Sequence, residues 1–319
     1  MEQIQRRLHG HLEEVEIKLE EALYTDDPFL DRLLGPLPKA GGKRIRPILV
    51  LLSVECFTPD ISQGIPLAVC AELMHTATLI HDDVVDHAGT RRGQPTMHSR
   101  WGNKIAILAG DHVFAKAFDV LAQLKNIKYF AAMSGMIAGM GAGEILQIFH
   151  AYDVSLAEGA YFERIKRKTA LFMGTCCELG ALAGGASDEV AGAMYEYGLN
   201  LGMAFQVADD LLDFMGDARK VGKPVASDLL EGNITLPVLH AMRQKGGQTI
   251  RRLIEQRSLT PDDIATIIGI AREAGSLEYA AKVAERFVDR ALQQLEMIPE
   301  SQAKADLIRL ARYSINRQS

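Results

Sequence analysis

The chain has 319 residues, 48% of them hydrophobic, and is therefore long enough to bury a large core. Its 35 basic and 41 acidic side chains leave a formal net charge of −6, which excludes the strongly basic surface typical of nucleic-acid-binding proteins. The first residues are charged rather than apolar and do not read as a signal peptide. The four cysteines show no metal-ligand spacing, and we expect them to be buried free thiols: Cys56, Cys70, Cys176 and Cys177.

Helical periodicity dominates the chain. Apolar residues at spacings of three and four, from Ile4 to Leu23, predict an amphipathic first helix. Further helices are expected at 46–57, 66–83, 103–123, 128–150, 158–183, 188–214, 235–244, 261–274, 276–295 and 301–314. Loops are expected at 35–47, 87–96 and 215–233, whereas alternating strand patterns are hard to find. The sequence therefore predicts an all-α protein with a single domain spanning residues 1–319.

The helix expected at 128–150 contains the longest uncharged run, from Tyr129 to Gly143. This run is shorter than the ~20 apolar residues that cross a bilayer, so we expect no transmembrane segment. Gly135, Gly139 and Gly143 recur every fourth residue and predict one helix face that another helix approaches closely. Three methionines of the same helix are expected to fill the core: Met133, Met136 and Met140.

Two acidic clusters share one spacing. The first, DDVVD, contains Asp82, Asp83 and Asp86, and the second, DDLLD, contains Asp209, Asp210 and Asp213. The first and fifth residues of each cluster lie about 40° apart around a helix, so their carboxylates point the same way. Such carboxylates repel one another unless a cation compensates them, and hard oxygen ligands suit Mg²⁺. One acidic triplet at a helix end is most often a solvated face, but two copies after apolar stretches indicate a metal site.

Basic residues supply the charge that a phosphate ligand needs. The loop GGKRIRP contains Lys43, Arg44 and Arg46 behind two glycines, and Arg91 and Arg92 follow DDVVD closely. Arginine binds phosphate oxygens with two N–H groups at once, and lysine adds a point charge. Alone, GGKRIRP is equally consistent with an ordinary surface loop. Next to two acidic clusters it indicates a site for phosphorylated substrates.

No other chemistry competes well with this interpretation. The sequence has no P-loop, no GxGxxG after a strand and no nucleophile elbow. His75 and His81, near DDVVD, are more typical of groups that contact substrate or support ligands than of zinc ligands. Lys168 and Lys223, taken singly, are more typical of the surface than of a site.

The motifs together resemble those of the all-trans polyprenyl diphosphate synthases, and most of all those of heptaprenyl diphosphate synthase large subunits. The segments that carry the resemblance are GGKRIRP, HDDVVDHAGTRRGQPT, GE at 143–144, KTA at 168–170, FQVADDLLDF and GKPVASDLLEGNITLP. The resemblance implies an isoprenoid synthase fold, a bundle of about 10–13 helices around a central cavity, with the acidic motifs facing each other across its mouth. One departure is Asn233, where many family members have a lysine. The diphosphate-binding role of that lysine is therefore not carried over.

The resemblance also implies a reaction and its residues. Isopentenyl diphosphate would condense head-to-tail with an allylic diphosphate: geranyl, farnesyl or geranylgeranyl diphosphate. Mg²⁺, about three ions per site and replaceable by Mn²⁺, would bind the allylic diphosphate. The implied metal ligands are Asp82, Asp86 and Asp209, supported by Asp83, Asp210 and Asp213. The residues implied for isopentenyl diphosphate are Lys43, Arg46, His75 and Arg92, and those for the allylic diphosphate are Arg91, Lys168, Thr169, Gln206 and Lys223. The residues expected to be catalytic are Asp82, Asp83, Asp86, Arg91, Lys168, Asp209 and Lys223.

Product length depends on residues that precede DDVVD. The growing tail is expected to run along the helix that carries this cluster, past Thr78 and Ala77 and then Met74 one turn deeper. Ala77 and Thr78 are small and leave the path open, so we predict a product of about C30–C40, with heptaprenyl favoured, for a quinone side chain such as that of menaquinone. A product that stops at C15 and does not respond to Ala77→Phe would contradict this prediction.

Three alternatives are weighed against this reading: a farnesyl or geranylgeranyl diphosphate synthase, a terpene cyclase, and a non-catalytic subunit. A cyclase needs no isopentenyl diphosphate site, so GGKRIRP and the second acidic cluster argue against it. Intact carboxylates in both clusters argue against a non-catalytic subunit. The resemblance further implies a cytoplasmic homodimer, or a heterodimer with a small regulatory subunit. It implies peripheral membrane contact during product release and no nucleic-acid partner.

Overall fold

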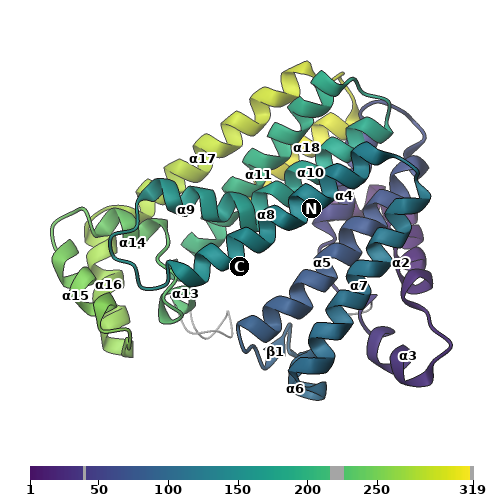
Figure 1. The fold of residues 1–319 in the computed structure, drawn as a ribbon. Helices are drawn as coiled ribbons and strands as arrows, with labels where there is room; N and C mark the ends of the chain where they lie inside the picture. Colours follow the sequence, from purple (N-terminus) through teal and green to yellow (C-terminus); the bar gives the residue numbers. More distant parts are fainter. Residues whose placement is uncertain (39–40, 216–225, 317–319) are drawn as a thin grey trace. The chain divides into compact units, whose positions relative to one another are not determined.

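The structure is a computed structural model that describes residues 1–38, 41–215 and 226–316. Apart from two strands of two residues each, the regular elements of this described part are helices, which confirms the predicted all-α class (Figure 1). The chain divides into two compact units. Unit 1 contains Met1–Ala132, Cys176–Ala191 and Pro299–Ala303, and unit 2 contains Met133–Thr175, Gly192–Ile298 and Lys304–Ser319. Neither unit is one contiguous segment, and the single domain stays a prediction.

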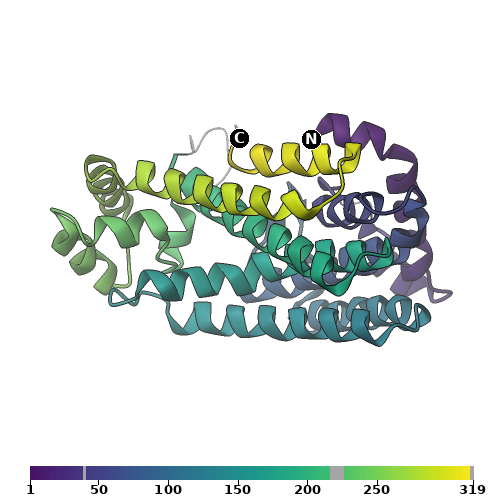
Figure 2. The same cartoon turned by 90° about the horizontal axis from the view of Figure 1, so that it is seen from above.

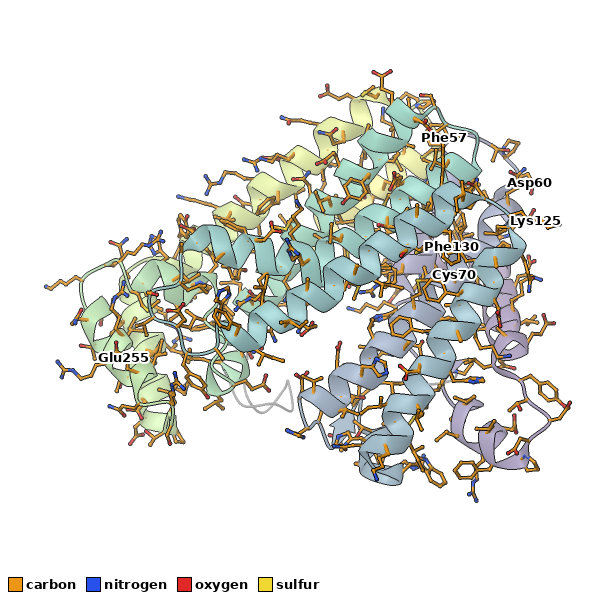
Figure 3. All side chains as sticks on the ribbon, viewed as in Figure 1. Phe57, Asp60, Cys70, Lys125, Phe130 and Glu255 are labelled. Atoms are coloured by element: carbon orange, nitrogen blue, oxygen red, sulfur yellow. The ribbon has the colours of Figure 1, made fainter. Side chains whose placement is uncertain are left out.

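Unit 1 is built around a long central helix. Its helices are α1 (Glu2–Arg7), α2 (His9–Leu23), α3 (Pro28–Leu34), α4 (Ile45–Glu55), η2 (Ile61–Gly64), α5 (Ile65–Val85), α6 (Met97–Trp101) and α7 (Asn103–Gln123). Helix α5 packs against α7, α4 and α2, and Figure 1 shows α5 and α7 side by side. Because α5 has neighbours on several sides, most of its first half is buried, including Cys70, which Figure 3 labels. All four cysteines are free and buried, as predicted.

Unit 1 differs from the sequence prediction in the short helices α3 and α6, which lie outside every predicted helix, and in two further features. The first helix breaks at Leu8, which has φ −90° and ψ 8°, so α1 ends at Arg7 and α2 begins at His9. The segment 87–96, expected to be a loop, contains an antiparallel hairpin of β1 (Thr90–Arg91) and β2 (Gln94–Pro95). Its two turn residues, Arg92 and Gly93, have φ values of 51° and 74°. Positive φ at both central positions is the requirement of the tightest hairpin turns, and the glycine satisfies it without strain.

Unit 2 contains the other helices, and three long helices pass through both units. The helices of unit 2 are α9 (Glu158–Ile165), η3 (Lys166–Ala170), α13 (Ser227–Leu230), α14 (Leu236–Ala241), α15 (Gly247–Glu255), α16 (Pro261–Glu273), α17 (Ser276–Gln294), η4 (Leu295–Met297) and α18 (Gln302–Ile315), whose first two residues are assigned to unit 1. The shared helices are α8 (Ile127–Phe149), α10 (Leu171–Ala183) and α11 (Asp188–Met215). Helices α14, α15 and α16 gather at the start of α17 (Figures 1 and 2). A capping box of Thr260 and Asp263 begins α16.

The predicted helix 158–183 is helical throughout but not uniform. Residues Lys166–Ala170 form a π-helical turn, η3, between α9 and α10. Such turns insert one extra residue into a helix and are frequent at functional sites. The turn shifts the faces of the flanking helices relative to each other, and it contains Lys168 and Thr169.

Helix α8 confirms part of the prediction for 128–150. A Cβ on Gly139 would lie 2.5 Å from Leu171 Cδ1, and a Cβ on Gly143 would lie 2.8 Å from Arg167 Cβ, so both glycines allow a close approach. The expectation was wrong for Gly135, because a Cβ there would meet no described atom within 4 Å. Met133 and Met136 are buried, and Met140 is half-buried.

The other face of α8 is exposed and apolar. Ile145, Ile148 and Phe149 have exposed fractions of 69%, 62% and 79%. Among the described helices, α8 alone is long and apolar enough to cross a membrane by length and composition. The uncharged run from Tyr129 to Gly143 is only part of α8, which has 23 residues, so length does not exclude a span.

Candidate active site

The first acidic cluster lies at the end of α5, and its three aspartates differ in how deeply they are buried. Asp83 is buried, and its Oδ1 accepts a hydrogen bond from Arg91 Nε at 2.7 Å. Burial raises the pKa of the Asp83 carboxyl, and the Arg91 guanidinium opposes this effect. Asp82 is half-buried and Asp86 is exposed, one helical turn apart. Asp82 and Asp86 therefore present carboxylate oxygens to solvent, where they can coordinate a metal. Asp83 instead links the end of α5 to strand β1 through Arg91.

The second acidic cluster, near the end of α11, has the same arrangement. Asp210 is buried, and it accepts hydrogen bonds from Tyr161 Oη at 2.7 Å and from Gln206 Nε2 at 2.8 Å. Asp209 is half-buried. Asp213 Oδ2 accepts a hydrogen bond from the backbone N–H of Asp228 at 3.3 Å. In both clusters the second aspartate is held by local partners, and the first is accessible.

Carboxylates crowd together around Asp210. Burial, and then the charge of Asp228, raises the pKa of Asp210 to about 7. Burial, and then the charge of Asp213, raises the pKa of Asp228 to about 6, although the charges of Lys168 and Arg164 oppose it. A cation would relieve this repulsion.

The donor atoms fit Mg²⁺ rather than a metal held by the protein alone. Within the described ranges, no three His, Cys, Asp or Glu side chains lie close enough to hold a metal ion. Mg²⁺ typically uses one or two carboxylates, and waters and substrate phosphates complete its shell. The accessible Asp82 and Asp86, and Asp209 in the other unit, are donors of this kind.

The residues predicted for the allylic diphosphate lie on η3, α11 and β1. Thr169 Oγ1 donates to Gln206 Oε1 at 2.8 Å, which joins η3 to the second acidic cluster. Lys168 Nζ lies 3.0 Å from Glu144 Oε1 and is half-buried. Lys223 lies outside the described residues. Arg91 uses its Nε for Asp83, and a guanidinium has further N–H groups for a second acceptor.

Tyr161 is a site residue that the sequence analysis missed. It is fully buried on α9, and its hydroxyl completes a chain of hydrogen bonds that runs from Thr169 through Gln206 and Asp210. Its only sequence signal is that it precedes Lys168 by seven residues, or two helical turns, in a segment where the π-helical turn disturbs that spacing.

Replacing Tyr161 with phenylalanine is expected to raise the KM for the allylic diphosphate about tenfold, because groups that orient ligand-binding side chains contribute on this scale. The KM for isopentenyl diphosphate should not change. Steady-state kinetics with each substrate varied would measure both values. Tyr197→Phe is the matched control, because Tyr197 is equally buried and its hydroxyl donates to Leu307 O at 2.8 Å. Equal kinetic effects in both variants would reduce Tyr161 to a structural role.

The residues predicted for isopentenyl diphosphate lie in unit 1. Arg92, at the tip of the hairpin, donates from Nη1 to the carbonyl of Gly41 in the GGKRIRP loop. Burial, and then the charges of Arg46 and Arg92, lower the pKa of His75 well below its ordinary value. Lys43 is exposed. The hairpin, the first turn of α4 and α5 therefore bring Arg92, Arg46 and His75 close enough to interact, and their environment favours the neutral form of His75.

His81 has a structural position on α5. Its Nε2 lies 3.0 Å from the carbonyl oxygen of Ile107 on α7. A Cβ on Gly110 would lie 2.2 Å from the same nitrogen, so the glycine makes room for the ring. This position agrees with the prediction that His81 supports ligand-binding residues.

The Arg44 side chain forms ion pairs within the protein and does not point to a ligand. Its guanidinium lies 2.5 Å from Glu16 Oε1, 2.6 Å from Glu72 Oε1 and 2.6 Å from Pro38 O. The Arg44 and Glu72 side chains are only 13% and 8% exposed. Arg44 is also the N-cap of α4 with a left-handed φ of 50°. It therefore anchors the junction between the loop that carries Lys43 and the first turn of α4, which carries Arg46.

Arg44→Met is expected to lower the free energy of unfolding by roughly 3 kcal/mol, because it leaves the Glu72 carboxylate buried without its partner. Denaturant unfolding followed by circular dichroism would measure the change. Arg6→Met is the control, because Arg6 and Glu2 form an exposed pair with side chains 77% and 86% accessible, and surface pairs contribute little. A similar small change in both variants would contradict the anchoring role.

The three predicted chain-length positions differ in accessibility. Ala77 and Met74 are 0% exposed and belong to the core of α5. Thr78 is half-buried and lies one turn before Asp82, on the same helix face. Thr78 therefore has the clearest access to the space in front of the acidic cluster.

Comparisons with known proteins agree with these motifs. Residues 27–271 match the family described as polyprenyl synthetase. Heptaprenyl diphosphate synthase component 2 of Bacillus subtilis is 37% identical over 96% of this chain and 88% of its own. A geranylgeranyl diphosphate synthase of Methanosarcina mazei is 34% identical over 88% of each chain. A crystal structure of a Caulobacter crescentus polyprenyl synthase, complexed with calcium and isoprenyl diphosphate, matches with a TM-score of 0.92 at 31% identity over 100% of this chain and 98% of that one.

Proposed function

Because the chain belongs to the polyprenyl synthetase family of trans-prenyltransferases, we propose that it condenses isopentenyl diphosphate with an allylic diphosphate to give a long-chain all-trans polyprenyl diphosphate. The observation that carries this proposal is the shared arrangement of the two acidic clusters. Each holds its second aspartate, Asp83 or Asp210, with local partners and leaves its first accessible. A non-catalytic subunit would have no need of this pattern in both clusters.

Asp82, Asp86 and Asp209 are the proposed ligands of Mg²⁺, in keeping with the calcium in the Caulobacter relative. When bound by these residues, Mg²⁺ would supply Lewis-acid assistance to the departing diphosphate. Lys168, Thr169 and Arg91 hold the allylic diphosphate, and Thr169 is oriented by its bond to Gln206. The number of metal ions is proposed, by the family pattern, to be about three. The placement of Lys223 in this group is likewise a proposal.

Isopentenyl diphosphate is proposed to bind Lys43, Arg46, His75 and Arg92. The allylic carbon–oxygen bond breaks to give an allylic cation and diphosphate. The double bond of isopentenyl diphosphate attacks the cation, and the diphosphate accepts the proton that is then lost. The protein residues supply positioning and fixed positive charge while excluding the water that would trap the cation.

We propose a product of about C30–C40, with heptaprenyl favoured, for a quinone side chain. The name of the Bacillus subtilis relative supports this length, whereas the name of the Methanosarcina mazei relative points to a shorter product. The small residue at Thr78 supports the longer chain, because a methyl and a hydroxyl leave room that an aromatic ring would fill.

A partner chain is proposed to cover the exposed face of α8. The side chains of Ile145, Ile148 and Phe149 are mostly exposed, and large apolar patches of this kind mark interaction surfaces. The word "component" in the Bacillus subtilis relative's name supports a small second subunit, with a homodimer as the other arrangement. We propose a cytoplasmic enzyme that touches the membrane when its product leaves.

The proposed activity is tested by Mg²⁺-dependent incorporation of labelled isopentenyl diphosphate into butanol-extractable product. The purified chain is assayed with geranyl, farnesyl and geranylgeranyl diphosphate, and with and without a candidate small subunit. Chromatographic sizing of the product then identifies the chain length and the preferred primer. Conversion of an allylic diphosphate to hydrocarbon without uptake of isopentenyl diphosphate would identify a cyclase instead.

A further inference from the structure

A pocket in unit 2 is lined by none of the residues assigned above to substrate or metal. It has a volume of about 600 Å³, within the range of ~300–1,000 Å³ that small-molecule sites occupy. Helices α9 and α17 form most of its walls, with Lys166 at the start of η3 and Met203 on α11. All of its lining residues therefore belong to one compact unit.

One side of the pocket is apolar. Met203 and Val283 are buried, and the half-buried rings of Phe162 and Phe287 lie edge to face with their centroids 5.8 Å apart. All four line the pocket. This surface suits a hydrocarbon or aromatic group.

The acidic side chains of the pocket are already compensated. Glu158 accepts hydrogen bonds on both oxygens, from Tyr279 Oη at 2.5 Å and from Arg243 Nη1 at 2.9 Å. Glu163 Oε1 accepts from Arg167 Nε at 2.7 Å. Neither carboxylate depends on the basic residues that line the pocket.

Three cations of the pocket lack such compensation. Across the described ranges, the ion pairs include none that involves Lys166, Arg286 or Arg290. Arg286 Nε donates to the carbonyl of Lys282 at 3.4 Å, and the Arg290 guanidinium lies 5.6 Å from the centre of the Phe287 ring. The guanidinium groups of Arg286 and Arg290 are one turn apart on α17 and retain N–H groups for a ligand.

We propose that this pocket binds an amphipathic organic phosphate. Its phosphate group binds Lys166, Arg286 and Arg290, and its hydrocarbon part lies against Phe162, Val283 and Phe287. Three positive charges match a phosphate dianion better than a single carboxylate, and arginine binds phosphate oxygens in pairs. The site shares no residue with the proposed reaction, so it stands or fails separately from the proposed function.

Gly159 offers a local test. It lines the pocket, and a Cβ there would meet no described atom within 4 Å, so Gly159→Cys places a thiol in open space. The native cysteines are all buried and should react slowly. The probe is n-decyl phosphate below its micellar concentration, without Mg²⁺. We expect it to slow alkylation of the introduced thiol about tenfold at saturation.

The matched control is Gly269→Cys, on α16 outside the pocket, where a Cβ also meets no described atom. Its thiol should not be protected. Adding Arg286→Gln and Arg290→Gln to Gly159→Cys should abolish protection, whereas adding Lys282→Gln, on the same helix outside the pocket, should preserve it. Because these three side chains are exposed, the changes should not affect folding, and circular dichroism checks this.

Separate arms test the two parts of the ligand. Inorganic phosphate and 1-decanol should each protect much less than decyl phosphate. Equal protection by either one, equal protection of the Gly269→Cys thiol, or protection that survives loss of both arginines would overturn the proposal.

Discussion

Alanine in place of Asp82 or of Asp209 is expected to lower kcat at least about 1,000-fold, because a metal acting as Lewis acid contributes several kcal/mol to the transition state. Both side chains are only half-buried, whereas those of their neighbours Asp83 and Asp210 are buried. The substitutions should therefore leave the helical content and the Tm close to those of the wild type. The incorporation assay and circular dichroism measure the two effects.

The matched control is Asp289→Ala, because Asp289 is an exposed aspartate on α17 outside both clusters. Its turnover should equal that of the wild type. Raising the Mg²⁺ concentration should recover part of the activity of conservative variants such as Asp82→Glu, but not that of alanine variants. Near-normal rates in Asp82→Ala or Asp209→Ala would refute the assignment of these residues as metal ligands.

Thr78→Phe is expected to shorten the product from about C35 to about C15–C20, because an aromatic ring one turn before Asp82 fills the path of the tail. Thr78 is half-buried, so a larger side chain there can extend into accessible space. Chromatography of the dephosphorylated products, with any required partner subunit present, gives the chain length. The rate of the first condensation should change little.

Thr76→Phe is the control for Thr78→Phe, since Thr76 is half-buried on the same helix but lies about 200° away around it. It should not shorten the product. Ala77→Phe, the test suggested by the sequence, is less direct because Ala77 is 0% exposed and a ring there overpacks the core. Products of equal length from wild type and Thr78→Phe would refute the role of this position.

The helices of this protein could be predicted with small errors because the signal for them is local. For α7 and α9–α10 the predicted ranges agree at both ends with the observed ones, and for α16 and α17 they agree within one residue. Errors occurred where local patterns were weak. The hairpin β1–β2 has only two residues per strand, and the break at Leu8 interrupts an apolar stripe that itself continues. The helices α3, α6, α13 and α15 were not predicted; all four are short, and α13 lies within the segment 215–233 that was expected to be a loop.

The candidate site was predicted as a set of residues, but not with the role of each one. DDVVD and DDLLD are visible as repeated spacing, since a helix places the first and fifth residues on one face. Adjacent aspartates look identical in the sequence, yet Asp83 is paired with Arg91 and Asp82 is accessible. That difference depends on a strand that follows α5.

The amino-acid order is sufficient to specify the helices, the two acidic motifs and the basic loop, because these depend on residues within a few turns of one another. Which polar side chains form hydrogen bonds or ion pairs inside the protein, and so are not exposed to a ligand, depends on residues far apart in the chain. Arg44 meets Glu16 and Glu72, each 28 residues away, and Tyr161 reaches Asp210 across 49 residues. Burial is what separates these roles, since a charge or hydroxyl removed from water must find a partner, and only the packed helices bring that partner within reach.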